Sequence, residues 1–190
     1  MLVCNILLWR MVVIANTLTI PNANAATAVK KLTTPVSALA KNSALPLRLR
    51  IASIGVNAPI EAVGLGADGA MGTPKIPSDT AWYMLGPKPG ETGSAVIAGH
   101  VNWWNGATSA FARLANIKVG DVIAVQDDLG AITTFTVAQI KRYDVTADPT
   151  NVFISTDGNA HLNLVTCIGT WNKRTKQYNQ RLVVFADKSE

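Results

Sequence analysis

The sequence predicts an all-β domain, a closed eight-stranded barrel with one or two short helices. Short apolar runs recur along the chain, and Gly, Asn, Asp and Pro separate them, as in β-proteins built from many short strands. Helical periodicity covers only one short stretch. Closing the sheet removes its exposed strand edges, which favours a barrel.

Seven segments have the pattern of strands, because apolar residues alternate with polar ones or form short buried runs. They are residues 48–53, 58–63, 94–98, 121–126, 132–142, 162–167 and 182–186. Residues 127–130, Asp-Asp-Leu-Gly, are typical of a hairpin connection. Residues 109–114 are predicted to form a short helix, with Phe111 and Leu114 on one face and Ser109 as its cap.

The 190 residues are enough for one domain. Residues 1–25 are expected to be a signal peptide or N-terminal membrane anchor. Their apolar run is interrupted by Arg10, and they end in Ala23-Asn24-Ala25, the spacing of a signal-peptidase site. Residues 26–46 are predicted to be a flexible linker, and residues 47–190 the folded domain. We therefore expect the protein to work in the cell envelope, outside the cytoplasm, anchored or secreted.

The composition argues against a disordered protein and against a nucleic-acid-binding protein. Hydrophobic residues make up 48% and charged residues 15% of the chain, which excludes a disordered protein. The net charge of +5 comes without a dense basic patch and interleaved aromatics, so nucleic acid is not an expected partner. A membrane surface remains an expected one.

The chain has two cysteines, Cys4 and Cys167. Cys4 lies in the predicted leader, so Cys167 has no partner in an exported protein whose leader is removed or buried in lipid. A leftover thiol in an oxidising compartment is either a liability or a group kept for chemistry.

Two histidines are available as a proton-transfer partner. His100 directly follows a predicted buried strand and is expected at the rim of the barrel, where functional groups tend to lie. His161 follows a turn and is interpreted as an ordinary exposed residue.

Arg181 is the preferred candidate for stabilising an oxyanion, and Arg174 the competing one. Cys167 ends one predicted strand and Arg181 begins the next. Antiparallel pairing would bring them to the same end of the barrel. Arg174 is placed second because it lies within the predicted loop 168–180, and a loop positions a donor less firmly.

Five ordered motifs resemble the sortase family over residues 48–187. They are Ala98-Gly99-His100, Phe111-Ala112-Arg113-Leu114, Gly120-Asp121, Leu164-Val165-Thr166-Cys167 and Arg181-Leu182-Val183-Val184. The family pattern around the nucleophile is usually Thr-Leu-x-Thr-Cys, and this chain departs from it with Asn163 at the first place. The resemblance does not assign the chain to one sortase class.

The resemblance implies a cysteine transpeptidase that cleaves a Leu-Pro-x-Thr-Gly-like signal near the C-terminus of secreted proteins. Cys167 would form a thioester acyl-enzyme, which an amine of a peptidoglycan precursor or a pilin would resolve. His100 would transfer protons, Arg181 would stabilise the oxyanion or anchor the signal, and Thr166 would help to position substrate.

The substrate groove is expected in the segment 143–160, where Val152 and Phe153 would receive the apolar part of the signal. Trp171, just after the thiol, would form a mobile wall. No cofactor is expected, and no required metal, because the loop carboxylates lack the spacing of a calcium loop.

Two other functions remain as alternatives. One is an L,D-transpeptidase, also a Cys/His cell-wall enzyme, but its Ser-x-Gly-Cys pattern is absent around Cys167. The other is a non-catalytic barrel that binds peptides, although all three chemical residues of an enzyme are in place.

Overall fold

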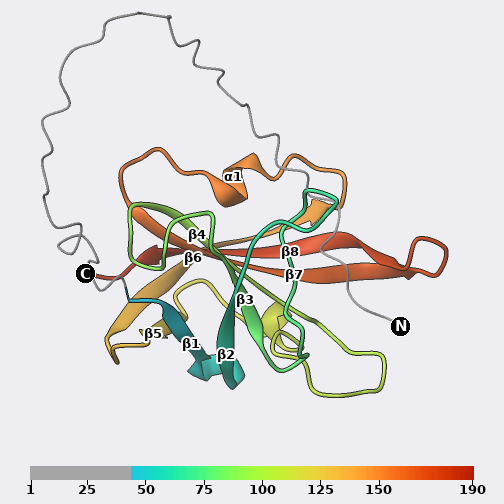
Figure 1. Cartoon of the computed structure of the whole chain (residues 1–190), viewed down its shortest axis with the longest axis horizontal. Helices are drawn as coiled ribbons and strands as arrows, with labels where there is room; N and C mark the ends of the chain where they lie inside the picture. Colours follow the sequence, from blue (N-terminus) through green and yellow to red (C-terminus); the bar gives the residue numbers. More distant parts are fainter. Residues whose placement is uncertain (1–43) are drawn as a thin grey trace, which may run out of the picture.

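The protein is a closed barrel whose strands follow the order β1-β2-β3-β4-β7-β8-β6-β5 in a computed structural model that describes residues 44–190 (Figure 1). The strands are β1 Pro46–Ile51, β2 Val56–Val63, β3 Thr80–Tyr83, β4 Gly93–Gly99, β5 Val122–Asp127, β6 Ile132–Asp144, β7 Ala160–Asn172 and β8 Gln177–Lys188. The helices are the 3₁₀ turns η2 Ala52–Ile54 and η3 Leu114–Asn116 and the short α1 Thr150–Phe153. The predicted closed eight-stranded barrel is confirmed.

Neighbouring strands are antiparallel except for two pairs, β2 with β3 and β4 with β7. A parallel pair needs a crossover connection rather than a tight turn. The crossover from β4 to β7 passes through β5, β6 and α1 and returns the chain to the neighbour of β4. This topology places the C-terminal end of β4 beside β7, although the two strands are distant in sequence.

Two apolar clusters lie on opposite faces of the sheet. All eight strands contribute to the first, for example through Leu49, Phe135 and Leu164, so it fills the barrel. The second, here called the outer cluster, contains alternate residues of β3, β4, β7 and β8, together with α1. Its members are Met71, Tyr83, Val96, Ala98, Val152, Phe153, Val165, Cys167 and Val183.

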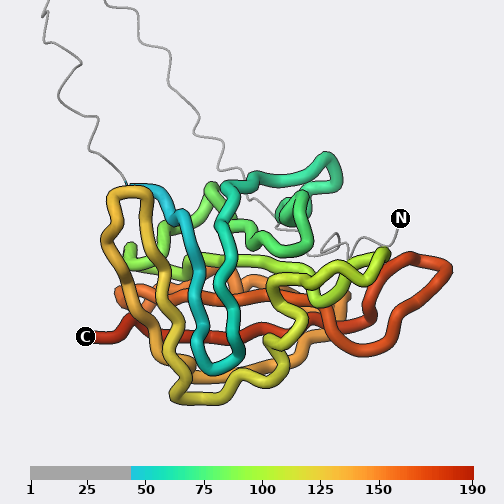
Figure 2. The backbone as a smooth tube through the Cα atoms, turned by 90° about the horizontal axis from the view of Figure 1, so that it is seen from below, coloured from blue at the N-terminus to red at the C-terminus, as the bar shows by residue number. Residues whose placement is uncertain are grey.

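Three predictions of local structure were wrong. Residues 110–113 form turns before η3 instead of a helix. β3 was missed. The predicted loop 168–180 is mostly strand: β7 and β8 continue as a hairpin that projects from the barrel, at the right in Figures 1 and 2.

The N-terminal predictions fall largely outside the described residues. The leader, 1–25, and most of the linker lie there. The end of the predicted linker belongs to the barrel, because Leu45 exchanges two hydrogen bonds of 2.9 Å with Asp128. Within residues 44–190, no helix has the length and apolar character needed to cross a membrane.

Candidate active site

Cys167 and Arg181 are directly opposite each other in the antiparallel β7–β8 pair. Opposite residues in such a pair project from the same face of the sheet, with Cβ atoms about 4.5–5.5 Å apart. Cys167 belongs to the outer cluster, so both side chains lie on the outer face of the barrel. The predicted proximity is confirmed, although Arg181 lies four positions inside β8, which begins at Gln177, and not at its start.

His100 follows the last residue of β4 and reaches the same place through the parallel β4–β7 pair. Ala98 is in register with Val165. Counting two residues further along each segment gives His100 and Cys167. The Thr166 hydroxyl donates a 2.8 Å hydrogen bond to the Gly99 carbonyl, so the alignment continues past the last paired residues. The topology therefore brings His100 beside Cys167.

A glycine is required immediately before His100. A Cβ at Gly99 would lie 2.5 Å from the Phe111 ring, closer than real Cβ contacts. The Phe111 amide also donates a 3.0 Å hydrogen bond to the His100 carbonyl. These contacts give a physical reason for two of the motifs, Ala98-Gly99-His100 and Phe111-Ala112-Arg113-Leu114, and they fix the backbone from which the imidazole projects.

The His100 imidazole is fully buried and has different surroundings at its two nitrogens. Nε2 lies 2.9 Å from the Pro74 carbonyl, while Nδ1 has no hydrogen-bond partner among the described residues. The Trp103 indole meets the ring edge-on at 4.8 Å between centroids. Burial lowers the pKa of His100, whereas the Pro74 bond and the charge of Glu61 raise it to a lesser extent. The neutral imidazole is therefore favoured at rest.

The Arg181 guanidinium is oriented by the main chain. Its Nη1 donates to the carbonyls of Tyr178 at 3.1 Å and Gln180 at 3.0 Å. Burial lowers the pKa of Arg181 to about 10, so the group still carries its charge at neutral pH. A fixed cation on the residue opposite Cys167 suits the stabilisation of a developing oxyanion.

Cys167 is disulfide-bonded in this structure of the whole chain. The expectation of an unpartnered thiol applied to a protein whose leader has been removed or buried in lipid. Nucleophilic chemistry uses the thiolate, so the chemistry described below belongs to the reduced protein.

Of the four predicted substrate residues, two belong to the outer cluster that contains Cys167. Val152 and Phe153 lie in α1, buried against the same cluster as Cys167. Thr166 is also buried, and its hydroxyl is already bonded to Gly99, which supports a positioning role. Trp171 lies in β7 instead of a loop. Its ring packs edge-on against the Tyr178 ring, with 5.2 Å between the ring centroids.

Sequence reasoning missed two links around the site. Tyr178 accepts a 2.8 Å hydrogen bond from Asn102, so the projecting hairpin is tied to the segment after His100. The Asn163 side-chain amide donates a 2.6 Å hydrogen bond to the Val152 carbonyl and holds α1 on the sheet. The special role of Asn163 could have been suspected from the sequence, because this residue is where the chain departs from the sortase pattern. Nothing marked Tyr178, which lies in a stretch that was interpreted as a loop.

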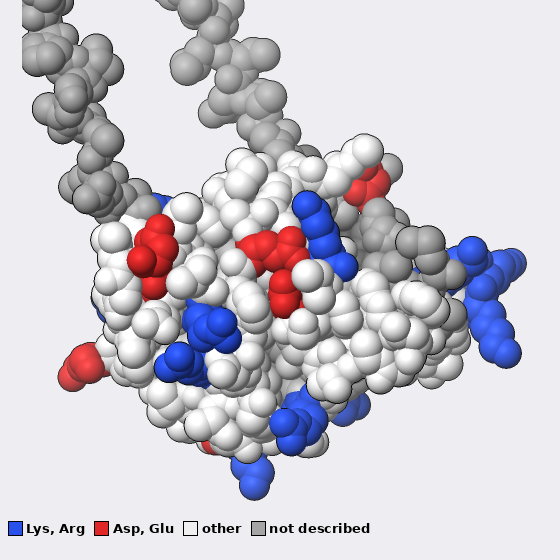
Figure 3. Space-filling model, turned by 60° about the horizontal axis from the view of Figure 1, so that its bottom comes forward, with Lys and Arg blue, Asp and Glu red and all other residues white. Residues whose placement is uncertain are grey.

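The competing residues lie elsewhere. Arg174 is exposed in the turn of the hairpin, where Lys and Arg side chains project from the molecule (Figure 3). His161 is more than an ordinary exposed residue, because it bridges Asp157 at 2.9 Å and Asp187 at 2.8 Å. These carboxylates raise its pKa against the opposing effect of burial. Over residues 44–190, no group of three or more His, Cys, Asp or Glu is arranged to hold a metal ion.

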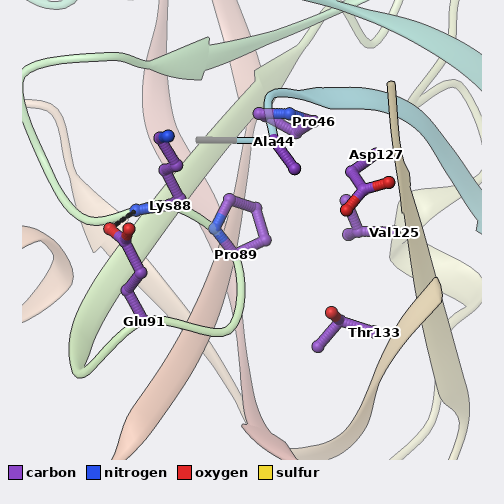
Figure 4. A pocket seen from close by; sticks show the side chains of 8 residues that line it. All are labelled: Ala44, Pro46, Lys88, Pro89, Glu91, Val125, Asp127 and Thr133. Atoms are coloured by element: carbon purple, nitrogen blue, oxygen red, sulfur yellow. Dashed lines mark hydrogen bonds between the residues drawn. The ribbon is translucent and has the colours of Figure 1, made fainter. Parts of the chain in front are cut away.

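A cavity of about 250 Å³ lies between β1, β5, β6 and the connection from β3 to β4 (Figure 4). Its lining residues are Ala44, Pro46, Lys88, Pro89, Glu91, Val125, Asp127 and Thr133. The lining contains no thiol or imidazole, so this cavity is separate from the Cys167 site. The Glu91 carboxylate accepts a 2.9 Å hydrogen bond from the Lys88 amide at its edge.

Comparison with known proteins identifies the family. The family model described as Sortase domain matches residues 49–189. Among solved structures, a lid mutant of sortase A from Corynebacterium diphtheriae has a TM-score of 0.61 at 22% identity, covering 77% of this chain and 70% of that one. Sortase C1 from Streptococcus agalactiae, in a complex with MTSET, has a TM-score of 0.60 at 20% identity, covering 76% of this chain and 69% of that one.

Sortase C-1 from Actinomyces oris has a TM-score of 0.61 at 21% identity, covering 76% of this chain and 75% of that one. At these identities the structural likeness establishes the fold, and sortases A and C resemble the chain to the same degree. No curated protein matches the sequence significantly.

Proposed function

The chain belongs to the sortase family, and we propose that it is an extracytoplasmic cysteine transpeptidase with Cys167 as nucleophile, His100 as proton-transfer residue and Arg181 as oxyanion stabiliser. The observation that carries this proposal is the strand register. It sets Arg181 opposite Cys167 on one side, and the end of β4 brings His100 beside Cys167 on the other.

The first half-reaction breaks a peptide bond of a Leu-Pro-x-Thr-Gly-like sorting signal. The Cys167 Sγ attacks the Thr carbonyl carbon, and its proton passes to His100. Arg181 stabilises the negative charge on the carbonyl oxygen of the tetrahedral intermediate. The imidazolium then gives the proton to the departing Gly amine, leaving a thioester between the Thr carbonyl and Sγ.

The second half-reaction transfers the protein to an amine. The incoming amine, from a peptidoglycan precursor or a pilin, attacks the thioester carbonyl and loses a proton to His100. The tetrahedral intermediate collapses and Sγ leaves, restoring the reduced enzyme. The same three groups serve both directions because the two steps are chemically the reverse of each other.

Substrate binding is proposed along the outer face of the sheet. Val152 and Phe153 pack on the cluster that contains Cys167, and Trp171 lies in the same strand as the nucleophile. Because Val152 and Phe153 are buried, they would support the wall that receives the Leu and Pro of a sorting signal, and the half-buried Trp171 would contact the signal. Thr166 positions the site from behind rather than contacting the signal.

The place of work is proposed to be the cell envelope. The leader at 1–25 supplies export or an anchor in this proposal, with a tether between it and the domain. Arg174 and the neighbouring Lys173 and Lys176 give the projecting hairpin a basic end suited to an anionic membrane surface.

A peptide-cleavage assay tests the proposal. The reduced protein is incubated with a fluorogenic library based on Leu-Pro-x-Thr-Gly, with and without an amine acceptor. We expect cleavage by the wild type, a transfer product when the amine is present, and neither with Cys167→Ala. A peptide-binding barrel would bind without cleavage, and an L,D-transpeptidase would act on wall peptides but not on this library.

A further inference from the structure

The connection between β2 and β3 supplies a second layer of contacts behind His100. Its Pro74 carbonyl is the group that faces the imidazole Nε2, at 2.9 Å. The next residue, Lys75, donates its backbone amide to the Glu61 carboxylate at 2.8 Å. A single peptide unit thus joins a carboxylate on β2 to the imidazole of the proposed active site.

We propose that Glu61 is a positioning residue for His100: it holds the 74–75 peptide so that the Pro74 carbonyl selects the Nε2–H tautomer and leaves Nδ1 to exchange protons with the reacting groups. The inference rests on the proposed function for its catalytic meaning. The contacts themselves concern only the resting imidazole.

The tautomer follows from the chemistry of the partner. A carbonyl oxygen can only accept a hydrogen bond, so Nε2 carries the proton. Nδ1 is then the nitrogen with the lone pair, and it is buried with no hydrogen-bond partner among the described residues. A base needs a free lone pair within reach of the proton it takes. Nδ1 is therefore the nitrogen assigned to proton transfer.

The segment that carries Pro74 needs an external support. It lies between β2 and β3 and has no strand structure of its own at residues 72–79. The Glu61 bond fixes it to β2, and β2 is paired with β3 at Glu61 itself. Proline adds rigidity because its ring restricts the backbone torsion at this position.

The charge of Glu61 has a separate effect from its hydrogen bond. It favours the imidazolium that forms when His100 accepts a proton and so offsets part of the effect of burial. The strand registers bring two further ionisable groups, Cys167 from β7 and Arg181 from β8, to the same end of the barrel as His100. Removing the Glu61 charge alone should lower the pKa of His100.

Nuclear magnetic resonance of the two histidines tests the proposal on the reduced full-length protein. Long-range ¹⁵N–¹H spectra report which ring nitrogen carries the proton, and a pH titration reports the pKa. We expect wild-type His100 to be the Nε2–H form. Glu61→Gln keeps an acceptor for the Lys75 amide, so the tautomer should persist while the pKa falls. Glu61→Ala should lose the tautomer preference and reduce kcat by up to about 10²-fold.

Glu91→Gln and Glu91→Ala are the matched controls, because the Glu91 carboxylate also accepts a backbone amide within a turn but lies at the cavity of Figure 4. They should leave the His100 spectrum and the kcat unchanged, and His161 is an internal reference in every spectrum.

An Nδ1–H form in the wild type would overturn the proposal, as would an unchanged tautomer preference and kcat in Glu61→Ala. If Glu61→Ala does not fold, Glu61→Asp decides by the same tautomer and kcat readouts, because its shorter side chain draws the carboxylate away from the Lys75 amide. Should the protein prove inactive toward sorting peptides, the spectra still test the tautomer, so the two proposals fail separately.

Discussion

Replacing Thr166 with Val isolates the hydrogen bond that aligns β4 with β7 at the site. The two side chains have nearly the same shape, so the substitution removes the 2.8 Å bond to the Gly99 carbonyl and little else. Both groups are buried at this point, where losing such a bond costs about 1–2 kcal/mol. For a domain of this size that corresponds to a fall in Tm of about 2–8 °C.

The same substitution should also reduce turnover, because Gly99 carries His100. A displacement of a positioned group by about 1 Å costs up to about 10²-fold in rate, so we expect kcat for peptide cleavage to fall by at least about tenfold. Thermal unfolding and cleavage kinetics of the reduced protein measure the two effects.

Thr80→Val is the matched control for this experiment. Thr80 is equally buried, and its hydroxyl also donates to a main-chain carbonyl, that of Pro59 at 2.9 Å. It should lower Tm by a similar amount and leave kcat within about twofold of the wild type. Equal losses of kcat in the two variants, or an unchanged kcat in Thr166→Val, would refute the alignment argument.

Three further outcomes are expected. Arg181→Lys should lower kcat by about 10²–10³-fold because it removes the guanidinium fork. Arg174→Ala should keep near wild-type cleavage. Normal cleavage by Arg181→Lys together with a loss in Arg174→Ala would mean that Arg174 is the oxyanion stabiliser. His161 has a raised pKa, so its ion pairs stabilise the fold fully below pH about 6.5 and are lost as pH rises through the folded-state pKa. His161→Gln should therefore lower Tm at pH 5.5 and have less effect at pH 9, and equal effects would contradict the pairing. A chain that begins at Leu45 should fold, stay soluble and cleave the peptide, and aggregation would assign the preceding residues to the working fold.

The barrel could be predicted because most strands have clear sequence limits. The β5–β6 hairpin is an example, since Asp127 and Gly130 close its turn as their residue types predict. β3 was not predictable in this way. All four residues of Thr80–Tyr83 are buried, so there is no alternation of apolar and polar side chains to mark a strand.

The projecting hairpin was missed for a related reason. Its residues from Ile168 to Gln180 are mostly half-buried or exposed and include Gly169, which is typical of a loop. A register irregularity between Ile168 and Trp171 allows β7 to continue past this point. The pairing of β7 with β8 overrides the local preference of these residues for a loop. This pairing cannot be read from the local sequence.

The part of the site that depends on residue chemistry and strand order could be predicted. Cys167 and Arg181 could be placed together because one strand ends near where its partner begins. The contacts behind His100 could not be foreseen, because Pro74 and Glu61 come from a connection whose path depends on the whole barrel.

Intact-protein mass spectrometry of the acyl-enzyme tests the central claim most directly. The reduced protein is mixed with a cleavable sorting peptide and quenched in acid before an amine is added. We expect a mass increase equal to the peptide up to and including Thr, located on Cys167 by fragmentation, reversed by an added amine and absent in Cys167→Ala. Cleavage without this adduct, or an adduct that persists in Cys167→Ala, would contradict Cys167 as the nucleophile.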